Sequence, residues 1–210
     1  QYTPQSFCQS LGLNLDDYVT ITSYTHHPMW SKFAVEVQDN WRWPLSYNVP
    51  MDDLCKIIDN AINNGYTVAW GGDVTEDGFT RKGLGIAYDV KKVRSMAGTD
   101  ADHWFKLSKD EKKEKFDSLG VNAPEVVPTQ AMRQEAFDNW ETTDDHGMLI
   151  YGLAKDNNGR EYFMVKNSWG ETGEYKGIWY MTKTFIAANT MDYTVNKNAI
   201  PKDIRKKLGI

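Results

Sequence analysis

The sequence predicts an α+β domain, because its two halves are patterned differently. Residues 51–64 carry apolar side chains at helical spacing, and the run Asn63-Asn64-Gly65 ends that helix. From Gly147 onward, short β-branched and aromatic runs alternate with turns, which predicts antiparallel strands. Helices early in the chain and an antiparallel run late in the chain are typical of the α+β class.

The same signals predict the remaining elements. A short helix begins at Pro4 and ends at Gly12, and residues 19–25 form a β-branched strand. A buried strand over 66–70 ends at Gly71-Gly72, and a helix covers Gln130 to Trp140. The strands of the second half are expected at 148–154, 162–165, 177–182 and 192–195, with a turn at 155–159 between the first two. Residues 89–140 are the least regular part and are interpreted as an insertion.

Composition limits the function classes. The 210 residues are enough for one large domain, taken here as 1–210, and carry a net charge of −5. An acidic chain without a basic stripe argues against nucleic-acid partners, and without a long apolar run it predicts no membrane span. The two cysteines make no disulfide framework, which favours a reducing compartment and predicts a cytoplasmic location. Because the sequence starts at Gln1, we expect that a preceding segment has been cleaved or left out.

Several motifs predict no site. His26 and His27 follow a strand, and adjacent side chains of an extended chain point opposite ways, so the pair is a poor chelate and is interpreted as surface residues. Nothing near His103 gives that histidine a role. The segment from Asp73 to Gly78 lacks the spacing of a calcium loop, and Gly83-Leu84-Gly85 is too short to hold a nucleotide.

His146 and Asn167 are the candidate site residues. A hairpin places the start of its first strand beside the end of its second. Residues 146 and 167 are symmetric about a turn at 156–157, so the imidazole and the amide are predicted to be neighbours. An amide oxygen that accepts one imidazole N–H fixes the tautomer of the ring, and an indole over that bond excludes water. We therefore predict His146 as base, Asn167 as its orienting group and Trp169 as the shield.

The motifs around these residues resemble those of papain-like cysteine peptidases. Asp145-His146-Gly147-Met148, the run 165–170 (Val-Lys-Asn-Ser-Trp-Gly) and the run 177–181 (Gly-Ile-Trp-Tyr-Met) are similar to the histidine and asparagine half of such enzymes. Segments 3–7, 68–74 and 198–202 are similar to the bleomycin hydrolase/aminopeptidase C branch.

This resemblance implies a papain-like α+β fold, in which the chain supplies mainly the antiparallel β-barrel-like lobe with packed helices. It implies a cysteine aminopeptidase that cleaves peptide substrates through a thioester acyl-enzyme, with no metal or cofactor, and a homohexamer as the assembly. The family's nucleophile resembles Gln-x5-Cys-Trp at a helix N-terminus. Neither Cys8 nor Cys55 has that context, and Cys55 lies on an apolar helix face as a packing residue. We therefore expect the chain to be the C-terminal portion of a peptidase, inactive alone and lacking the lobe that holds the nucleophile.

Two other functions remain open from the residues. One is a papain-fold binding or scaffold module without a catalytic half, which an upstream Cys-Trp in the gene would argue against. The other is a self-sufficient peptidase that uses Cys8, in which case iodoacetamide should label Cys8 preferentially near pH 6.

The end of the chain carries a separate prediction. The resemblance implies a C-terminal arm whose carboxylate meets the α-amino group of the substrate. Here the tail from Lys202 to Ile210 is short and has four basic residues against one acid, Asp203. We therefore predict that Ile210 does not occupy the cleft and that exopeptidase selectivity is weaker than in relatives.

Overall fold

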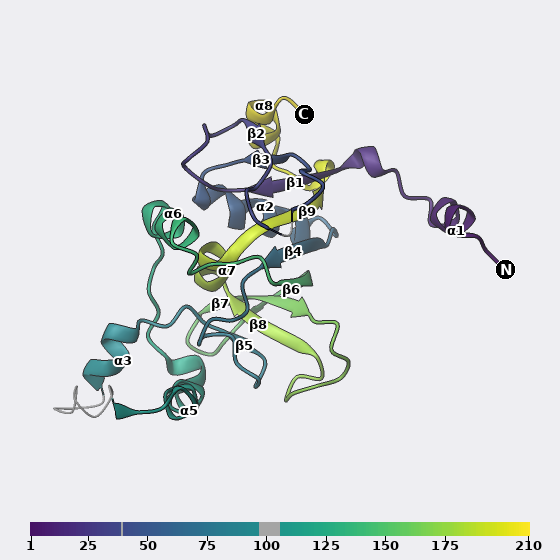
Figure 1. Ribbon diagram of the computed structural model, residues 1–210. Helices are drawn as coiled ribbons and strands as arrows, with labels where there is room; N and C mark the ends of the chain where they lie inside the picture. The colour runs from purple at the N-terminus through teal and green to yellow at the C-terminus, as the bar shows by residue number, and fades with distance from the viewer. Residues whose placement is uncertain (39, 97–105) are drawn as a thin grey trace.

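The computed structural model describes residues 1–38, 40–96 and 106–210, and its α+β class agrees with the sequence prediction. His103 and the middle of the predicted insertion lie outside the described residues. The described strands form one sheet in the order β2-β3-β1-β9-β4-β6-β7-β8-β5, with its two ends at β2 and β5 (Figure 1). Their bounds are β1 Tyr18–Thr22, β2 Lys32–Phe33, β3 Ser46–Asn48, β4 Val68–Gly72, β5 Leu84–Gly85, β6 His146–Lys155, β7 Glu161–Lys166, β8 Ile178–Thr182 and β9 Thr190–Asn196.

The pairing in the sheet is mainly antiparallel. Parallel pairs join β1 to β3 and β5 to β8, near the two ends of the sheet. The centre is antiparallel: β9 pairs with β1 and β4, β6 pairs with β4 and β7, and β7 pairs with β8. The predicted strand at 66–70 is shifted, because β4 continues through Gly71 and Gly72 with an irregularity between them.

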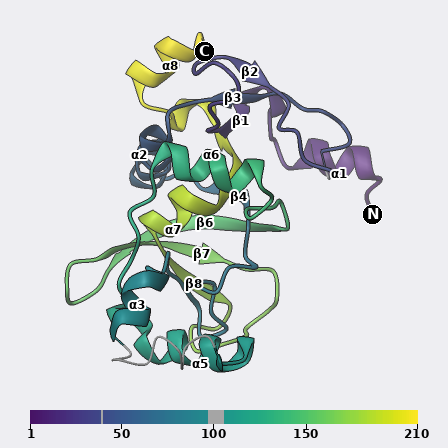
Figure 2. The ribbon, with the colours of Figure 1, turned by 60° about the vertical axis from the view of Figure 1, so that its left-hand side comes forward.

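The described helices are distributed around this sheet. They are α1 Pro4–Ser10, α2 Met51–Asn63, α3 Val90–Met96, α5 Lys109–Leu119, α6 Gln130–Asp138, α7 Lys183–Asn189 and α8 Lys202–Leu208, with short 3₁₀ turns at Leu15–Asp17, Gly120–Asn122 and Lys197–Ala199. None of the helices in the described part of the chain is both long and apolar enough to cross a bilayer. The predicted insertion holds α3, α5 and α6; α3 and α5 lie together at the end of the molecule opposite α8 (Figures 1 and 2).

One face of the central sheet is covered by α2 and α7, which contact each other and the strands behind them. The helical spacing over 51–64 is explained by this contact, because Leu54, Ile57, Ile58 and Ala61 are all fully buried. They pack with inward residues of β6, of which Met148 and Ile150 belong to the same core. Outward positions of β6 are exposed: Leu149 is 39%, Tyr151 37% and Leu153 38% accessible. The sheet therefore carries an uncovered apolar strip on β6.

The N-terminal helix α1 stands apart from the sheet in both views (Figures 1 and 2). Pro4 begins it, as the sequence indicated, and Thr3 caps it, but none of its residues is buried. Tyr2, Phe7, Leu11 and Leu13 are all more than half exposed. Local capping, rather than packing on the domain, therefore holds this helix.

Candidate active site

His146 and Asn167 form the hydrogen bond that the sequence predicted. Nε2 of His146 lies 2.9 Å from Oδ1 of Asn167, at the junction where β6 begins and β7 has just ended. The same amide oxygen accepts the backbone N–H of Ser168 at 2.7 Å, so two donors fix its orientation. Asn167 is 2% exposed, which removes competing water from the bond.

The register that brings them together differs from the predicted one. The hairpin turn is centred near residue 158, since Lys155 pairs with Glu161. The register changes once more between Ile150 and Gly152, where β6 is irregular. The turn lies within the predicted 155–159, but the predicted centre of symmetry at 156–157 is wrong. His146 still reaches Asn167 because side chains that are diagonal neighbours across a strand pair lie within contact range.

The free nitrogen of His146 is the chemically important one. Nδ1 has no hydrogen-bond partner among the residues that the structure describes, whereas Nε2 donates to the amide oxygen. In this tautomer Nδ1 has a lone pair that can accept a proton from a group approaching the ring. A ring nitrogen held in this way can act chemically as a general base.

Trp169 lies against the imidazole, with ring centroids 4.8 Å apart and planes inclined by 37°. The indole is half exposed, but it rests edge-on against a stacked pair made of Phe79 and Trp179. Trp179 is fixed in turn by its Nε1–H, which donates to the carbonyl of Thr80 at 2.9 Å. Phe79 gave no signal in the sequence, because its part in this support depends on a contact between segments ninety residues apart.

Gly177 closes the loop that carries these residues. Its φ is +81°, and a Cβ at this position would lie 2.0 Å from the carbonyl oxygen of Gly170. Its own carbonyl accepts the backbone N–H of Asn167 at 3.0 Å. A side chain at 177 would therefore displace the backbone that presents Asn167 and Trp169.

A model of the Peptidase C1-like family matches residues 1–119 and 118–209. The chain belongs to the Peptidase C1-like family. Aminopeptidase C of Lactobacillus helveticus is 25% identical over 210 residues, covering 97% of this chain and 40% of that protein. Aminopeptidase G of Lactobacillus delbrueckii subsp. lactis is 26% identical over 211 residues, covering 99% of this chain and 42% of that protein.

The fold agrees with this membership. The crystal structure of PepW from Lactobacillus rhamnosis superposes with a TM-score of 0.67 at 19% identity, over 100% of this chain and 42% of that one. This Peptidase C1-like chain therefore has the papain-like fold that the resemblance implied. The chain spans about two fifths of the length of the curated relatives named above.

The two cysteines of this Peptidase C1-like chain lie in different settings. Cys55 is largely buried on α2, with its Sγ 3.5 Å from the carbonyl oxygen of Lys183, and burial raises the pKa of its thiol to about 12. Cys8 is exposed on α1, the helix that stands apart from the sheet in Figures 1 and 2. Ile210 follows α8, beside β2 and away from β6.

Acidic side chains surround the segment before His146. Asp73 is fully buried and accepts hydrogen bonds from Thr75 and from the backbone N–H of Thr143. Asp145 accepts the N–H of Val74 at 3.1 Å, and burial, reinforced by the nearby Asp73 carboxylate, raises the pKa of Asp145 to about 6. These bonds tie the 143–145 segment to the end of β4 and so set the point at which His146 begins its strand.

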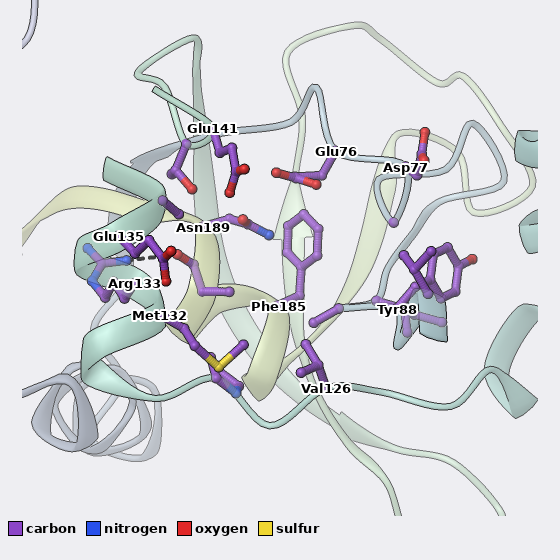
Figure 3. A pocket seen from close by; sticks show the side chains of 18 of the residues that line it. Glu76, Asp77, Tyr88, Val126, Met132, Arg133, Glu135, Glu141, Phe185 and Asn189 are labelled. Carbon is purple, nitrogen blue, oxygen red and sulfur yellow. Dashed lines mark hydrogen bonds between the residues drawn. The ribbon is translucent and has the colours of Figure 1, made fainter. Parts of the chain in front are cut away.

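Two hollows flank this region. A shallow groove of about 450 Å³ adjoins Asn167 and is lined by Ala69, Trp70, Gly71, Gly147, Met148, Leu149, Lys166 and Ser168. A larger hollow of about 650 Å³ lies between α6, α7 and residues 76–91, with Glu76 and Glu141 on one side and Met132 and Val126 on the other (Figure 3). Asn167 lines the smaller groove, and neither His146 nor Asn167 lines the larger hollow. The candidate site is therefore at the smaller groove.

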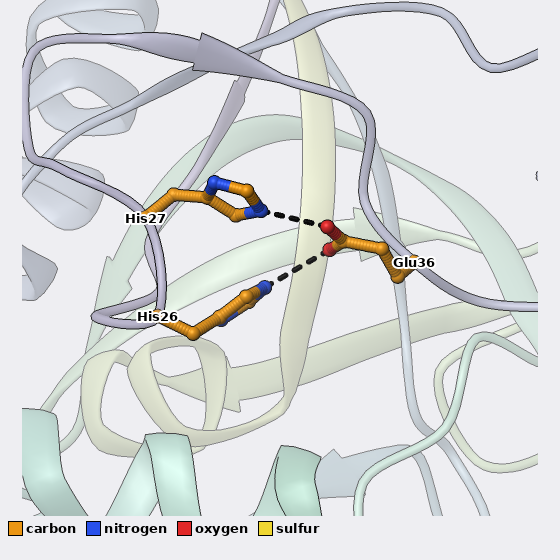
Figure 4. A group of neighbouring side chains, drawn as sticks. All are labelled: His26, His27 and Glu36. Carbon is orange, nitrogen blue, oxygen red and sulfur yellow. Dashed lines mark hydrogen bonds and ion pairs between the residues drawn. The ribbon is translucent and has the colours of Figure 1, made fainter.

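The prediction that His26 and His27 diverge is wrong. Residues 25–27 form a turn rather than extended chain, so adjacent side chains lie on the same side. Both imidazoles point at one carboxylate, that of Glu36 (Figure 4).

Proposed function

We propose that this chain carries the histidine and asparagine of a thiol peptidase site, and that the whole protein is a cysteine aminopeptidase. The single observation that carries this proposal is the His146–Asn167 hydrogen bond, which leaves Nδ1 of the imidazole free to accept a proton. Membership of the Peptidase C1-like family and the names of the aminopeptidase relatives support the same reaction class.

The reaction would proceed in two stages. Nδ1 of His146 takes the proton of a cysteine thiol, and the thiolate attacks the carbonyl carbon of the peptide. The imidazolium then gives its proton to the leaving amine as the C–N bond breaks, which leaves a thioester. Water, deprotonated by the same nitrogen, attacks the thioester and releases the new carboxylate, and the proton returns to the sulfur. Asn167 keeps the ring in place through both stages by accepting from Nε2–H.

The thiol in this proposal comes from a segment outside the 210 residues. Cys55 is unsuited, because a thiol whose pKa is raised to about 12 is almost entirely protonated at neutral pH. Cys8 is exposed on α1, and that helix stands apart from β6, the strand that His146 begins (Figure 1).

The lobe that supplies the thiol is proposed to cover the outward face of β6. Leu149, Tyr151 and Leu153 form an exposed apolar strip there, and the groove beside Asn167 adjoins it. A peptide substrate would then bind between that lobe and the groove, as ligand sites between two lobes generally do.

Hydrolysis of an aminoacyl-coumarin substrate tests the proposal. The 210-residue chain alone is expected to give no turnover above buffer, whereas the protein with its upstream lobe is expected to be active. Turnover by the chain alone that disappears in Cys8→Ser would overturn the external-thiol part of the proposal. Full activity of His146→Ala in the longer protein would overturn the role of the imidazole.

A further inference from the structure

Among the described residues, a second group of histidines lies on the opposite side of α6 from the larger hollow and is built by His26, His27 and Glu36. Nε2 of His26 lies 2.9 Å from one carboxylate oxygen of Glu36, and Nε2 of His27 lies 2.7 Å from the other (Figure 4). One potential ligand atom from each residue falls within 4.8 Å of the other two. The side chains are 29%, 34% and 42% exposed, so an ion can reach them from solvent.

Stacking fixes the directions of both rings. The imidazole of His27 stacks on Phe33 with centroids 4.2 Å apart and planes inclined by 23°. The imidazole of His26 is nearly parallel to Phe137, at 5.3 Å and 13°. Because Phe33 and Phe137 both belong to one apolar cluster, the two Nε2 atoms are held toward the same carboxylate, each at a different oxygen, before any ligand arrives.

The turn that makes adjacent rings converge is held from outside. The fully buried amide of Asn48 donates to the carbonyls of Tyr24, His27 and Pro28, and accepts the backbone N–H of Tyr24. Four bonds from one side chain thus fix the backbone on both sides of the histidine pair. The convergence is a property of the fold rather than of two mobile surface side chains.

Gln134 supplies an outer contact to the first ring. Its amide oxygen and nitrogen lie 3.5 and 3.1 Å from Nδ1 of His26. Without an ion, Nε2–H of His26 donates to Glu36 and Nδ1 accepts from the amide nitrogen. When Nε2 binds an ion, Nδ1 carries the hydrogen, and the amide oxygen is placed to accept it after a small rotation, as outer ligands of metal-bound histidines do.

We propose that His26, His27 and Glu36 form a binding site for a divalent transition metal, with Zn²⁺ as the ion that fits best. Two imidazole nitrogens and one carboxylate oxygen are ligands that zinc prefers, whereas Mg²⁺ and Ca²⁺ prefer oxygen alone. With Zn–ligand distances of about 2.1 Å, a tetrahedral site needs N···O separations of about 3.4 Å. The present N···O separations of 2.9 and 2.7 Å are shorter than this by roughly 0.5 and 0.7 Å, so the exposed Glu36 side chain has to withdraw by that amount. The two imidazole nitrogens, which lie within 4.8 Å of each other, have to adopt the same separation of about 3.4 Å. A fourth position stays open to water.

The test is to treat the full chain with a chelator and then titrate it with Zn²⁺, measuring the binding by calorimetry. The visible absorption of bound Co²⁺ is the second probe. One ion per chain is expected, with a melting temperature that rises with Zn²⁺ concentration. Glu36→Gln, which is nearly isosteric, and His27→Ala are each expected to weaken binding at least tenfold. Glu174→Gln, an exposed glutamate elsewhere, and His146→Ala are expected to leave binding unchanged.

The assignment is overturned if no saturable binding occurs, or if Glu36→Gln and His27→Ala bind as tightly as the parent chain. It is also overturned if His146→Ala removes the binding, or if X-ray absorption of the Zn²⁺ complex finds a sulfur ligand. Circular dichroism and melting in chelator establish whether each variant is folded. If a variant unfolds, X-ray absorption of the parent Zn²⁺ complex tests the assignment in its place. The spectrum must then show two imidazole ligands on the ion.

Discussion

Two groups of histidines in the described part of the chain present their imidazole rings to different acceptors. His146 donates Nε2–H to a neutral amide that is 2% exposed, and its other nitrogen has no partner among the described residues. His26 and His27 instead share one carboxylate that is 42% exposed on its side chain. A neutral, buried acceptor fixes the ring through one nitrogen and leaves the other nitrogen able to accept a proton. A carboxylate shared by two rings instead favours a cation between them. The first arrangement suits the proton acceptor proposed above, and the second suits the proposed metal ion.

The largest effect is expected from removing the ring at the first site. In a longer protein with the proposed upstream lobe, His146→Ala should lower kcat/KM by about 10³-fold, because the proposed thiol would lose the group that takes its proton. Steady-state hydrolysis of an aminoacyl-coumarin at pH 7 measures this. A loss of less than tenfold would contradict the proposed role of the imidazole.

Removing the amide is expected to cost less. Asn167→Ala deletes a buried acceptor of an N–H that becomes charged during the reaction, and such bonds are worth about 1.5–3 kcal/mol, or roughly 10- to 100-fold in rate. The loss should appear in kcat, with KM nearly unchanged. Asn157→Ala, in the exposed turn of the same hairpin, is the matched control and should retain the parent rate. Equal losses in both variants would indicate damage to the hairpin rather than loss of the orienting bond.

The sequence was sufficient to predict which residues form the first site, but not the strand register that brings them together. The apolar strands and the turn residues indicated a hairpin, and the residue types at its open end indicated a base and its acceptor. The register could not be predicted, because it depends on Gly159, whose φ is +84°, on the bonds that Asp156 accepts from Asn158 and Arg160, and on the irregularity in β6. Those features move the turn centre by more than one residue without breaking the His146–Asn167 contact.

The second site was not predictable, and the reason is also physical. Adjacent side chains diverge on an extended chain and converge only when the backbone turns. The turn at 25–27 is stabilised by Asn48, and the rings are oriented by Phe33 and Phe137. These partners lie between six and about a hundred and ten residues away in the sequence, so no local pattern carries the information.

The two sites are expected to act independently. No described hydrogen bond or ion pair joins His26, His27 or Glu36 to His146 or Asn167, so replacing both His26 and His27 by alanine should change kcat/KM less than about twofold in metal-free buffer. The same assay as above measures it, with chelator present throughout. A loss of tenfold or more would mean that the 25–36 segment supports the peptidase site.

The smallest expected effects concern two carboxylates, one at or beside each site. Their contributions to the stability of the folded protein change with pH in opposite directions. Burial raises the pKa of Glu36 somewhat, but hydrogen bonds from His26 and His27 outweigh it and hold the pKa of Glu36 below its usual range. Its contribution to stability is therefore present above its unfolded pKa of about 4.3 and is lost as pH falls through the lower folded value. Glu36→Gln should lower the free energy of unfolding at pH 7.5, and the deficit should shrink in acid.

Asp145 should behave in the reverse sense. Because its pKa is raised to about 6 by burial and by Asp73, the folded protein keeps a proton that the unfolded chain, with a pKa of about 3.9, has already released. Stability therefore falls as pH rises from about 4 to 6, and Asp145→Asn should remove that fall. The carboxyl group is only partly buried and the residue as a whole is exposed, so solvent screening limits the gain to about 0.5 kcal/mol at pH 7.5, with no difference at pH 4. Urea unfolding at both pH values measures this free energy. An Asp145→Asn variant that is less stable than the parent at pH 7.5 would contradict the prediction. It would mean that the bond from Val74 to the ionised carboxylate stabilises the segment before His146 more than repulsion from Asp73 destabilises it.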